Sequence, residues 1–129
     1  MKMEFTMRGL DIYTSEVDDK GIDFVARTGA DNYWDVQVKS VYKSKYIFFL
    51  KSAFDIQRAN LLVAVVRFVN GEAPIIYLIP AQAWKSPNGL LVSRDYEGKL
   101  CAPEWGVQLS QKNIPLLSPY DFELVVGTL

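Results

Sequence analysis

The stretch GIDFVARTGADNYWDVQVKS, residues 21–40, decides the fold that this sequence predicts. Two runs in which apolar and polar residues alternate, residues 21–28 and 33–41, flank a segment of Gly, Ala, Asp and Asn. A period of two predicts β-strands, and the small and polar residues between them predict a tight connection. We therefore expect an antiparallel hairpin here.

The hairpin carries polar side chains on one face. Side chains point alternately to the two faces of a strand, so Phe24 and Val36 mark the core side. Asp23, Gln37 and Lys39 then share the opposite side. Asp23 lies level with Gln37 or Lys39 only if the connection has an odd number of residues or a bulge shifts the pairing. The hairpin thus predicts a carboxylate, an amide and an ammonium aimed the same way.

These side chains suit phosphodiester hydrolysis. That reaction uses a divalent ion to activate water and to neutralise charge in the transition state, and Mg²⁺ prefers oxygen ligands. Asp23 offers a carboxylate oxygen, Gln37 an amide oxygen and Val38 its backbone carbonyl. Lys39 is suited to position water or to stabilise a phosphate oxygen. The simpler alternative is that Asp23 caps a turn or pairs with Lys39.

The segments GID (residues 21–23) and VQVKS (residues 36–40) resemble the motif of the PD-(D/E)xK nuclease superfamily. The resemblance covers about residues 3–69. It is strongest to the branch of Mrr-type restriction endonucleases and archaeal Holliday-junction resolvases, and the run DDKGID is similar to bacterial members. In this family an Asp begins the second core strand, and a Glu/Gln-x-Lys motif lies on the third. The resemblance implies a restriction-endonuclease-like αβββαβ core, with Asp23 and Gln37 as metal ligands and Lys39 as the catalytic lysine.

The resemblance also bears on the cofactor, the partner and a further ligand. It implies Mg²⁺ or Mn²⁺ as cofactor and favours DNA over RNA as partner. It leaves a homodimer open, because such nucleases often dimerise. The first helix of the family often supplies another acid. Here that helix is short, and the candidates for this acid are Glu4 within it or Glu16, Asp18 and Asp19 in the following loop.

The remaining elements follow from periodicity, capping residues and turns. We expect a short helix at residues 3–8 that ends at Gly9, and strands at residues 10–13, 46–50, 61–69 and 75–79. The run LLVAVVRFV, residues 61–69, is almost continuously apolar, which predicts a strand buried on both faces.

Helices are expected at two further places. Ser52 and Asp55 match a capping box, which predicts a short helix through about residue 60. Ser118 is expected to begin a C-terminal helix that runs to about residue 125. The order predicts one α/β domain over residues 1–129, with a mixed central sheet flanked by helices and an irregular C-terminal extension from about residue 85.

Basic residues cluster after the hairpin. Residues 36–58 carry five basic and one acidic side chain, whereas residues 1–35 carry four basic and eight acidic ones. An acidic metal side beside a basic phosphate side suits a nuclease groove. We therefore expect nucleic-acid contacts from Lys43, Lys45, Lys51 and Arg58. The alternative is an ordinary solvated face.

Composition narrows the classes of function. The 129 residues include no histidine, which excludes Ser-His-Asp and Cys-His catalysis and histidine metal sites. The lone Cys101 has no partner for an internal disulfide and is expected to be buried and inert. A net charge of −1 excludes a uniformly basic protein that coats nucleic acid. No secretory signal or membrane-length apolar run is visible, so we expect a cytoplasmic protein with no membrane partner.

Three functions stay open. The leading one is a PD-(D/E)xK-like domain with Mg²⁺-dependent nuclease activity on DNA. The second is a nucleic-acid-binding module that keeps the fold without a competent metal site, for which the short first helix and Gln37 speak. The third is a protein-interaction or regulatory domain that uses the aromatic-rich C-terminal half.

Overall fold

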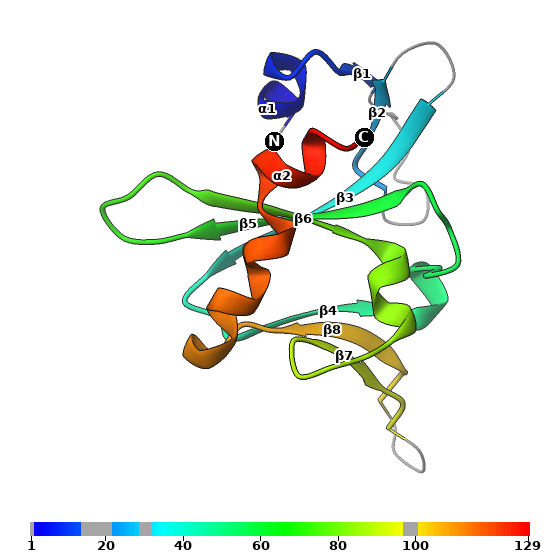
Figure 1. Ribbon diagram of the computed structural model, residues 1–129. Coiled ribbons are helices and arrows are strands. Elements are labelled where there is room, and N and C mark those ends of the chain that lie inside the picture. The colour runs from blue at the N-terminus through cyan, green and yellow to red at the C-terminus, as the bar shows by residue number, and fades with distance from the viewer. Residues whose placement is uncertain (1, 14–21, 29–31, 97–100) are drawn as a thin grey trace.

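The computed structural model describes residues 2–13, 22–28, 32–96 and 101–129 (Figure 1). Its helices and strands are α1 (Lys2–Met7), β1 (Asp11–Tyr13), β2 (Phe24–Thr28), β3 (Asn32–Tyr42), β4 (Tyr46–Leu50), β5 (Leu61–Phe68), β6 (Ile75–Pro80), β7 (Leu91–Arg94), β8 (Glu104–Gln108) and α2 (Phe122–Val126). Three segments form 3₁₀ helices, namely η1 (Lys51–Ala53), η2 (Ala81–Lys85) and η3 (Gln111–Tyr120).

Within the described residues the strands form two sheets. The central sheet has five strands in the order β1-β2-β3-β5-β6, and the second has three in the order β4-β8-β7. In the central sheet β3 and β5 run parallel, while the other neighbours are antiparallel. The expected mixed central sheet is therefore present, and both expected hairpin strands, β2 and β3, belong to it.

Strand β5 lies at the centre of the hydrophobic core. Its first six residues are all buried, and the first five alternate between two hydrophobic clusters. Leu62 and Ala64 belong to the cluster that also holds Phe5 of α1 and Phe122 of α2. Leu61 and Val63 belong to the cluster on the other side of the sheet. The prediction that this strand is buried on both faces is confirmed.

Helices cover one face of the central sheet, and the second sheet covers the other. Figure 1 shows α1 and α2 on one side of the central sheet and β4, β7 and β8 on the opposite side. The cluster between the two sheets draws residues from β5 and β6 but takes only Val41 from β3. The side of β2 and β3 that faces away from the helices is thus left partly uncovered.

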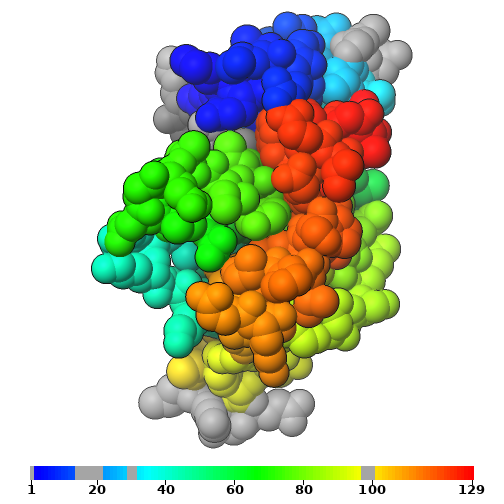
Figure 2. Space-filling view, turned by 60° about the vertical axis from the view of Figure 1, so that its left-hand side comes forward, coloured from blue at the N-terminus to red at the C-terminus, as the bar shows by residue number. Residues whose placement is uncertain are grey.

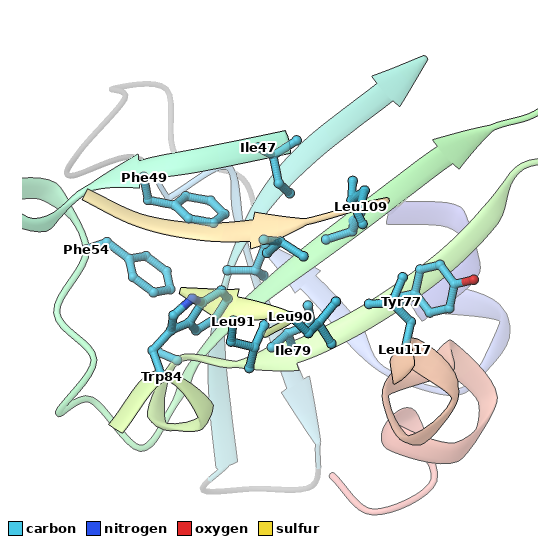
Figure 3. Packing of buried hydrophobic residues seen from close by; sticks show 14 of the residues in the cluster. Ile47, Phe49, Phe54, Tyr77, Ile79, Trp84, Leu90, Leu91, Leu109 and Leu117 are labelled. Atoms are coloured by element: carbon cyan, nitrogen blue, oxygen red, sulfur yellow. The ribbon is translucent and has the colours of Figure 1, made fainter. Parts of the chain in front are cut away.

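Aromatic rings fill the space between the two sheets (Figure 3). Trp84 of η2 is fully buried, and its indole N–H donates to the carbonyl of Gly106 at 3.0 Å. Phe49 stacks on Phe54 with ring centroids 4.8 Å apart, and both rings meet Trp84 edge-on. Burial of aromatics of this size contributes strongly to stability, so this cluster holds the second sheet against the first.

The prediction of a helix after Ser52 is wrong. Only the three residues of η1 are helical, and Phe54 directly after them is extended, with φ −140° and ψ 99°. The Asp55 carboxylate accepts a hydrogen bond from the Gln57 N–H at 2.9 Å, which stabilises a local turn in place of a capped helix. The extended backbone allows Phe54 to reach Trp84, and the free energy of burying this ring outweighs a weak helix-start pattern.

The segment expected to be irregular contains two strands. β7 and β8 lie within residues 85–118, and β8 pairs with β4 on one side and with β7 on the other. β4 was expected as a strand, but it belongs to this second sheet. The pairing of β4 with β8 joins segments more than fifty residues apart, which local sequence patterns do not encode. Cys101 in this segment is exposed, contrary to the expectation that it is buried.

Both terminal helices are short. α1 is six residues long and is followed by Gly9 with φ +85°, as its position after the helix predicts. α2 begins one turn later than expected, because the Asp121 carboxylate, in place of Ser118, accepts a hydrogen bond from the Glu123 N–H. No helix in the described ranges is long and apolar enough to cross a membrane.

Candidate nuclease site

Asp23 is fixed against the edge of β3. Its backbone N–H donates to the carbonyl of Val36 at 2.9 Å, and its Oδ2 accepts from the N–H of Val38 at 2.6 Å. The Asp23 carboxylate thus accepts the Val38 N–H in place of the backbone carbonyl that a neighbouring strand would offer. Two hydrogen bonds hold the carboxylate beside the VQVK segment, although the residue itself is exposed.

The hairpin register places Asp23 beside the second expected ligand. Phe24 pairs with Val36, and Thr28 pairs with Asn32, so three residues separate the two strands. This odd number is what the shared polar face requires. The pairing ends at Phe24 and Val36, and the hydrogen bonds of Asp23 to Val36 and Val38 place it beside the residues that flank Gln37.

Gln37 and Lys39 lie on the face of β3 that points away from the helices. Val36 is fully buried on the helix side, whereas Gln37 and Lys39 are half-buried on the other. The Lys39 ammonium lies 5.3 Å from the centroid of the Phe49 ring. Its aliphatic stem therefore extends toward the second sheet, and the cation–π contact holds its charged end at the margin of the core.

The Val38 carbonyl also faces Asp23. In an extended strand the N–H and C=O of one residue point to the same side. Since the Val38 N–H points to Asp23, the Val38 carbonyl lies along the same edge of β3. One carboxylate, one amide and one backbone carbonyl are therefore grouped at this point of the sheet.

A cavity of about 660 Å³ adjoins this edge. Its lining includes Ile22, Val25, Asp35, Phe54 and Arg58, whereas Asp23, Gln37 and Lys39 are not among its lining residues. The carboxylate of Asp35 forms an ion pair with the guanidinium of Arg58 inside it. The cavity is thus formed by β2, β3 and the segment that follows η1, directly beside the candidate ligands.

Lys51 lines the same cavity with its ammonium already engaged. Its Nζ donates to Ser93 Oγ and to Asp95 Oδ1, each at 2.6 Å, and lies 4.0 Å from the centroid of the Trp105 ring. These contacts fix the ammonium and reduce its capacity to bind a phosphate. Arg58 and Lys51 are therefore close to the candidate site but are both partnered.

Lys43 and Lys45 lie at the opposite end of β3. They line a different cavity, together with Arg67 and Asn70 from the end of β5 and the turn after it. The five basic residues of the segment therefore do not form one continuous surface. Lys51 and Arg58 line the cavity at one end of the parallel pair β3 and β5, Lys43 and Lys45 line the cavity at the other end, and Lys39 lies between them.

Of the acids proposed to complete the site, Glu4 is the one that the described residues include, and it lies away from the site. Glu4 lines a cavity with Asp121 and Glu123 on the side of the sheet where the helices lie. Glu16, Asp18 and Asp19 fall outside the described residues. Among the residues that the structure describes, no three or more His, Cys, Asp and Glu side chains gather in a way that could hold a metal ion.

Asp35 is an acid to which the sequence pattern assigned no role. It lies two residues before Gln37, so the alternating pattern Asp-x-Gln-x-Lys places it on the same face as Gln37 and Lys39. The alternation was visible in the sequence, but the ion pair with Arg58 depends on a turn that was expected to be a helix.

The donor set fits a hard divalent cation with few protein ligands. Mg²⁺ is commonly held by one or two carboxylates, with water and substrate phosphate completing its shell. One oxygen of Asp23 is hydrogen-bonded to Val38, and its second oxygen, the Gln37 amide and the Val38 carbonyl are the ligands that this edge offers. This set suits weak metal binding that is strengthened by the charge of a bound phosphate.

The chain has a restriction-endonuclease-like fold. It combines a mixed sheet, in which β3 and β5 run parallel, with a short first helix, and it places an Asp beside the strand that carries Gln-x-Lys. Among solved structures, the Holliday junction resolvase Hjc from the archaeal hyperthermophile Archaeoglobus fulgidus matches the chain with a TM-score of 0.57. The match covers 97% of this chain and 88% of that one, at 14% sequence identity. The expected fold class, a restriction-endonuclease-like mixed α/β fold, is confirmed. A scan of family models finds no match, and a search of curated proteins returns no significant match.

Proposed function

We propose that this protein is a metal-dependent nuclease that hydrolyses phosphodiester bonds in DNA. The observation that carries the proposal is the pair of hydrogen bonds that hold Asp23 against Val36 and Val38, next to Gln37 and Lys39. These bonds satisfy the Val38 N–H and at the same time fix the carboxylate beside the Gln-x-Lys segment. The Hjc-like fold supports the same class of chemistry.

The side chains have distinct roles in this proposal. Asp23, Gln37 and the Val38 carbonyl hold Mg²⁺ or Mn²⁺, which supplies charge neutralisation and an activated water molecule when bound. Lys39 orients the attacking water or stabilises the phosphate oxygen that gains charge. The contact with Phe49 limits the directions that the Lys39 ammonium can take, so less rotamer entropy is lost when phosphate arrives.

Arg58 and Asp35 act on the substrate side of the site. The Arg58 guanidinium lies in the adjoining cavity, and Asp35 fixes its position through their ion pair. A guanidinium held in this way can donate further hydrogen bonds to a phosphate, because Arg carries five N–H donors. Lys51 acts mainly by its charge, since its ammonium is bound by Ser93 and Asp95.

The proposal includes finer points that rest on the sequence resemblance. We assign the protein to the branch of Mrr-type restriction endonucleases and archaeal Holliday-junction resolvases, as a bacterial, cytoplasmic member. DNA is its partner, and it acts as a homodimer. Size-exclusion chromatography with light scattering tests the homodimer, which a monomer at micromolar concentration overturns.

The central experiment is DNA cleavage with Mg²⁺ or Mn²⁺ on linear, nicked and branched duplexes. Asp23→Asn and Lys39→Met should each reduce the rate by about 10²-fold or more, the scale of a lost general acid–base or charge-stabilising group. Asp11→Asn and Lys85→Met, at exposed positions outside this edge, are matched controls and should keep full activity. Cleavage that persists in EDTA, or that is unchanged in Asp23→Asn, contradicts the proposal.

A gain-of-function variant, Gln37→Glu, tests directly whether Gln37 is a metal ligand. Gln37→Glu adds a negative charge at the edge where Asp23 lies, so it should raise Mn²⁺ affinity severalfold, as titration calorimetry measures. Gln82→Glu, at an exposed position on η2, is the matched control. If Gln37→Glu leaves the affinity unchanged, Gln37 is not a ligand.

A second function is favoured by one observation. Only one of the three motif side chains is acidic, and the described residues contain no group of three or more His, Cys, Asp or Glu that could hold a metal ion. A nucleic-acid-binding module of the same fold without catalysis fits these facts. It predicts DNA binding that falls with salt and does not respond to Mn²⁺. Calorimetry that detects Mn²⁺ binding lost in Asp23→Asn decides for the nuclease.

A further inference from the structure

A second cavity, of about 290 Å³, lies at the far end of the parallel pair β3 and β5 from the Asp35–Arg58 cavity. It is formed by the end of β3, the turn into β4, the end of β5, and residues just before and within η3. Figure 2 shows these segments coming together on one face, with residues near 45 in teal, near 70 in green and near 112 in orange. At about 3.3 Å per residue, Asp35 and Tyr42 at the two ends of β3 are roughly 23 Å apart.

The lining of this second cavity is positively charged. Lys43, Lys45 and Arg67 all contribute to it. None of the described residues that line it is acidic, and the closest acid along the chain, Glu72, lies beyond the lining in the turn after β5. The three cations have no salt bridge among the described residues. Their charges are therefore available to an anion, in contrast to those of Lys51 and Arg58.

Two exposed aromatic residues, Tyr42 and Phe68, also line this cavity. Tyr42 and Phe68 are register partners in the parallel pair, so they lie side by side on the same face of the sheet. Tyr42 is 54% exposed and Phe68 is 45% exposed, although the other apolar residues of β5 are all buried. The Tyr42 hydroxyl donates to Asn70 Oδ1 at 2.7 Å, which holds this ring in place.

The backbone keeps a cation next to these rings. Lys43 has a φ of 62°, in the left-handed region that non-glycine residues adopt only at some cost in free energy. This conformation turns the chain so that the Lys43 ammonium lies 5.2 Å from the centroid of the Tyr42 ring. A charged group and an exposed ring are thus held together at the mouth of the cavity.

We propose that this cavity is a second nucleic-acid contact, which binds a single strand of DNA. Single-strand sites combine cations that follow the phosphates with aromatic rings on which unpaired bases stack. Lys43, Lys45 and Arg67 supply the first component, and Tyr42 and Phe68 supply the second. In duplex DNA the bases are stacked on each other, so exposed rings favour a strand end, a flap or a branch.

This inference extends the proposed function but does not depend on cleavage. The residues of the second cavity are separate from Asp23, Gln37 and Lys39. Binding of a fluorescein-labelled dT12 strand, followed by anisotropy without divalent ions, therefore measures it directly. No cleavage occurs in this measurement because divalent ions are absent, so failure of the nuclease proposal and failure of this one are distinguishable.

The stacking part of the proposal is tested by Phe68→Leu. This variant keeps an apolar side chain but removes the ring, and it should weaken dT12 binding about tenfold, the scale measured for a lost base–aromatic stack. Phe48→Leu is the matched control, because Phe48 is 48% exposed on β4 and lies outside the cavity. An equal effect of the two variants, or none from Phe68→Leu, overturns the proposal.

The charge part is tested by Lys43→Asn with Lys45→Ala, where Asn is chosen because it tolerates a positive φ. This double variant should weaken dT12 binding and lower the slope of log affinity against log salt by about 1.4, or 0.7 for each lost phosphate contact. Lys2→Ala with Lys85→Ala removes the same charge elsewhere and should change neither. If the wild-type protein binds duplex DNA as tightly as dT12, or does not bind dT12 at low salt, the single-strand assignment is wrong.

Discussion

Oδ2 of Asp23 lies 2.6 Å from the backbone nitrogen of Val38 and accepts its hydrogen bond. The acid and the strand that carries Gln37 and Lys39 are thus linked directly, with no side chain between them. The contact has a structural consequence besides its proposed catalytic one, because it satisfies an N–H where β2 no longer pairs with β3. The fold and the candidate site therefore share one residue.

Asp23→Ala should lower the free energy of unfolding by about 1 kcal/mol, since it removes one hydrogen bond to a charged acceptor at an exposed position. Asp23→Asn should cost less, because its amide oxygen can still accept from Val38. Urea denaturation followed by circular dichroism measures both values. Identical stabilities for the two variants contradict a stabilising role for this hydrogen bond.

Arg58→Met should destabilise the protein by about 1–3 kcal/mol, because it leaves the Asp35 carboxylate, which is only 15% exposed, without its cation. Adding Asp35→Asn to Arg58→Met should recover part of the loss, since the uncompensated charge is then removed. A double-mutant cycle in urea gives the coupling between the two residues. Simple additivity of the two changes rules out the ion pair as a stabilising contact.

Gly106→Ala should destabilise the second sheet, because an added Cβ collides with the phenol ring of Tyr46, which packs directly on this glycine. The cost should be about 1–3 kcal/mol, the usual scale for overpacking. Tyr46→Ala removes the obstructing ring, so Gly106→Ala should cost much less in that background. Thermal unfolding of the four proteins in this cycle measures the difference, and an unchanged cost shows that the strain arises elsewhere.

The pKa of Tyr46 is raised, first by burial and then by the hydrogen bond from its hydroxyl to the Glu104 carboxylate, whose charge acts in the same direction. The Arg94 guanidinium over the ring opposes the shift. Because the folded pKa exceeds the unfolded value of about 10, the folded state keeps the proton longer. Stability from this group is present below pH 10 and is lost as pH rises above it.

Tyr46→Phe should therefore flatten the loss of stability between about pH 10 and 11, as urea midpoints at a series of pH values would show. It should also lower stability at neutral pH, because the buried Glu104 loses its hydrogen-bond donor. Tyr33→Phe, at an exposed position, serves as the control and should keep the wild-type pH dependence. A wild-type alkaline profile in Tyr46→Phe shows that another group governs it.

Local sequence patterns were sufficient to predict the strands of the central sheet. The alternation in β2 and β3 and the continuous apolar run of β5 predicted strands, because burial on one or both faces dictates which residues a strand can carry. Gly9 predicted the end of α1 in the same way. The polar face with Gln37 and Lys39 followed from the period of two alone.

Local patterns failed where partners are distant in the chain. β8 is formed by EWGVQ, which shows little alternation, and it is a strand because β4 and β7 lie on either side of it. The helix expected after Ser52 did not form, because Phe54 is buried more favourably in an extended chain against Trp84. In both cases tertiary packing outweighed a weak local preference.

The sequence by itself determined the strands of the hairpin and the face on which Gln37 and Lys39 lie, because these depend only on the alternation of side chains along a strand. The register that brings Asp23 to β3 came from the structure. Only the tertiary structure decided how the cations divide between two cavities and which of them are engaged. Parallel pairing of β3 with β5 sends Lys43 and Lys45 to one end and Arg58 to the other. That separation depends on long-range pairing, which a run of neighbouring residues does not specify.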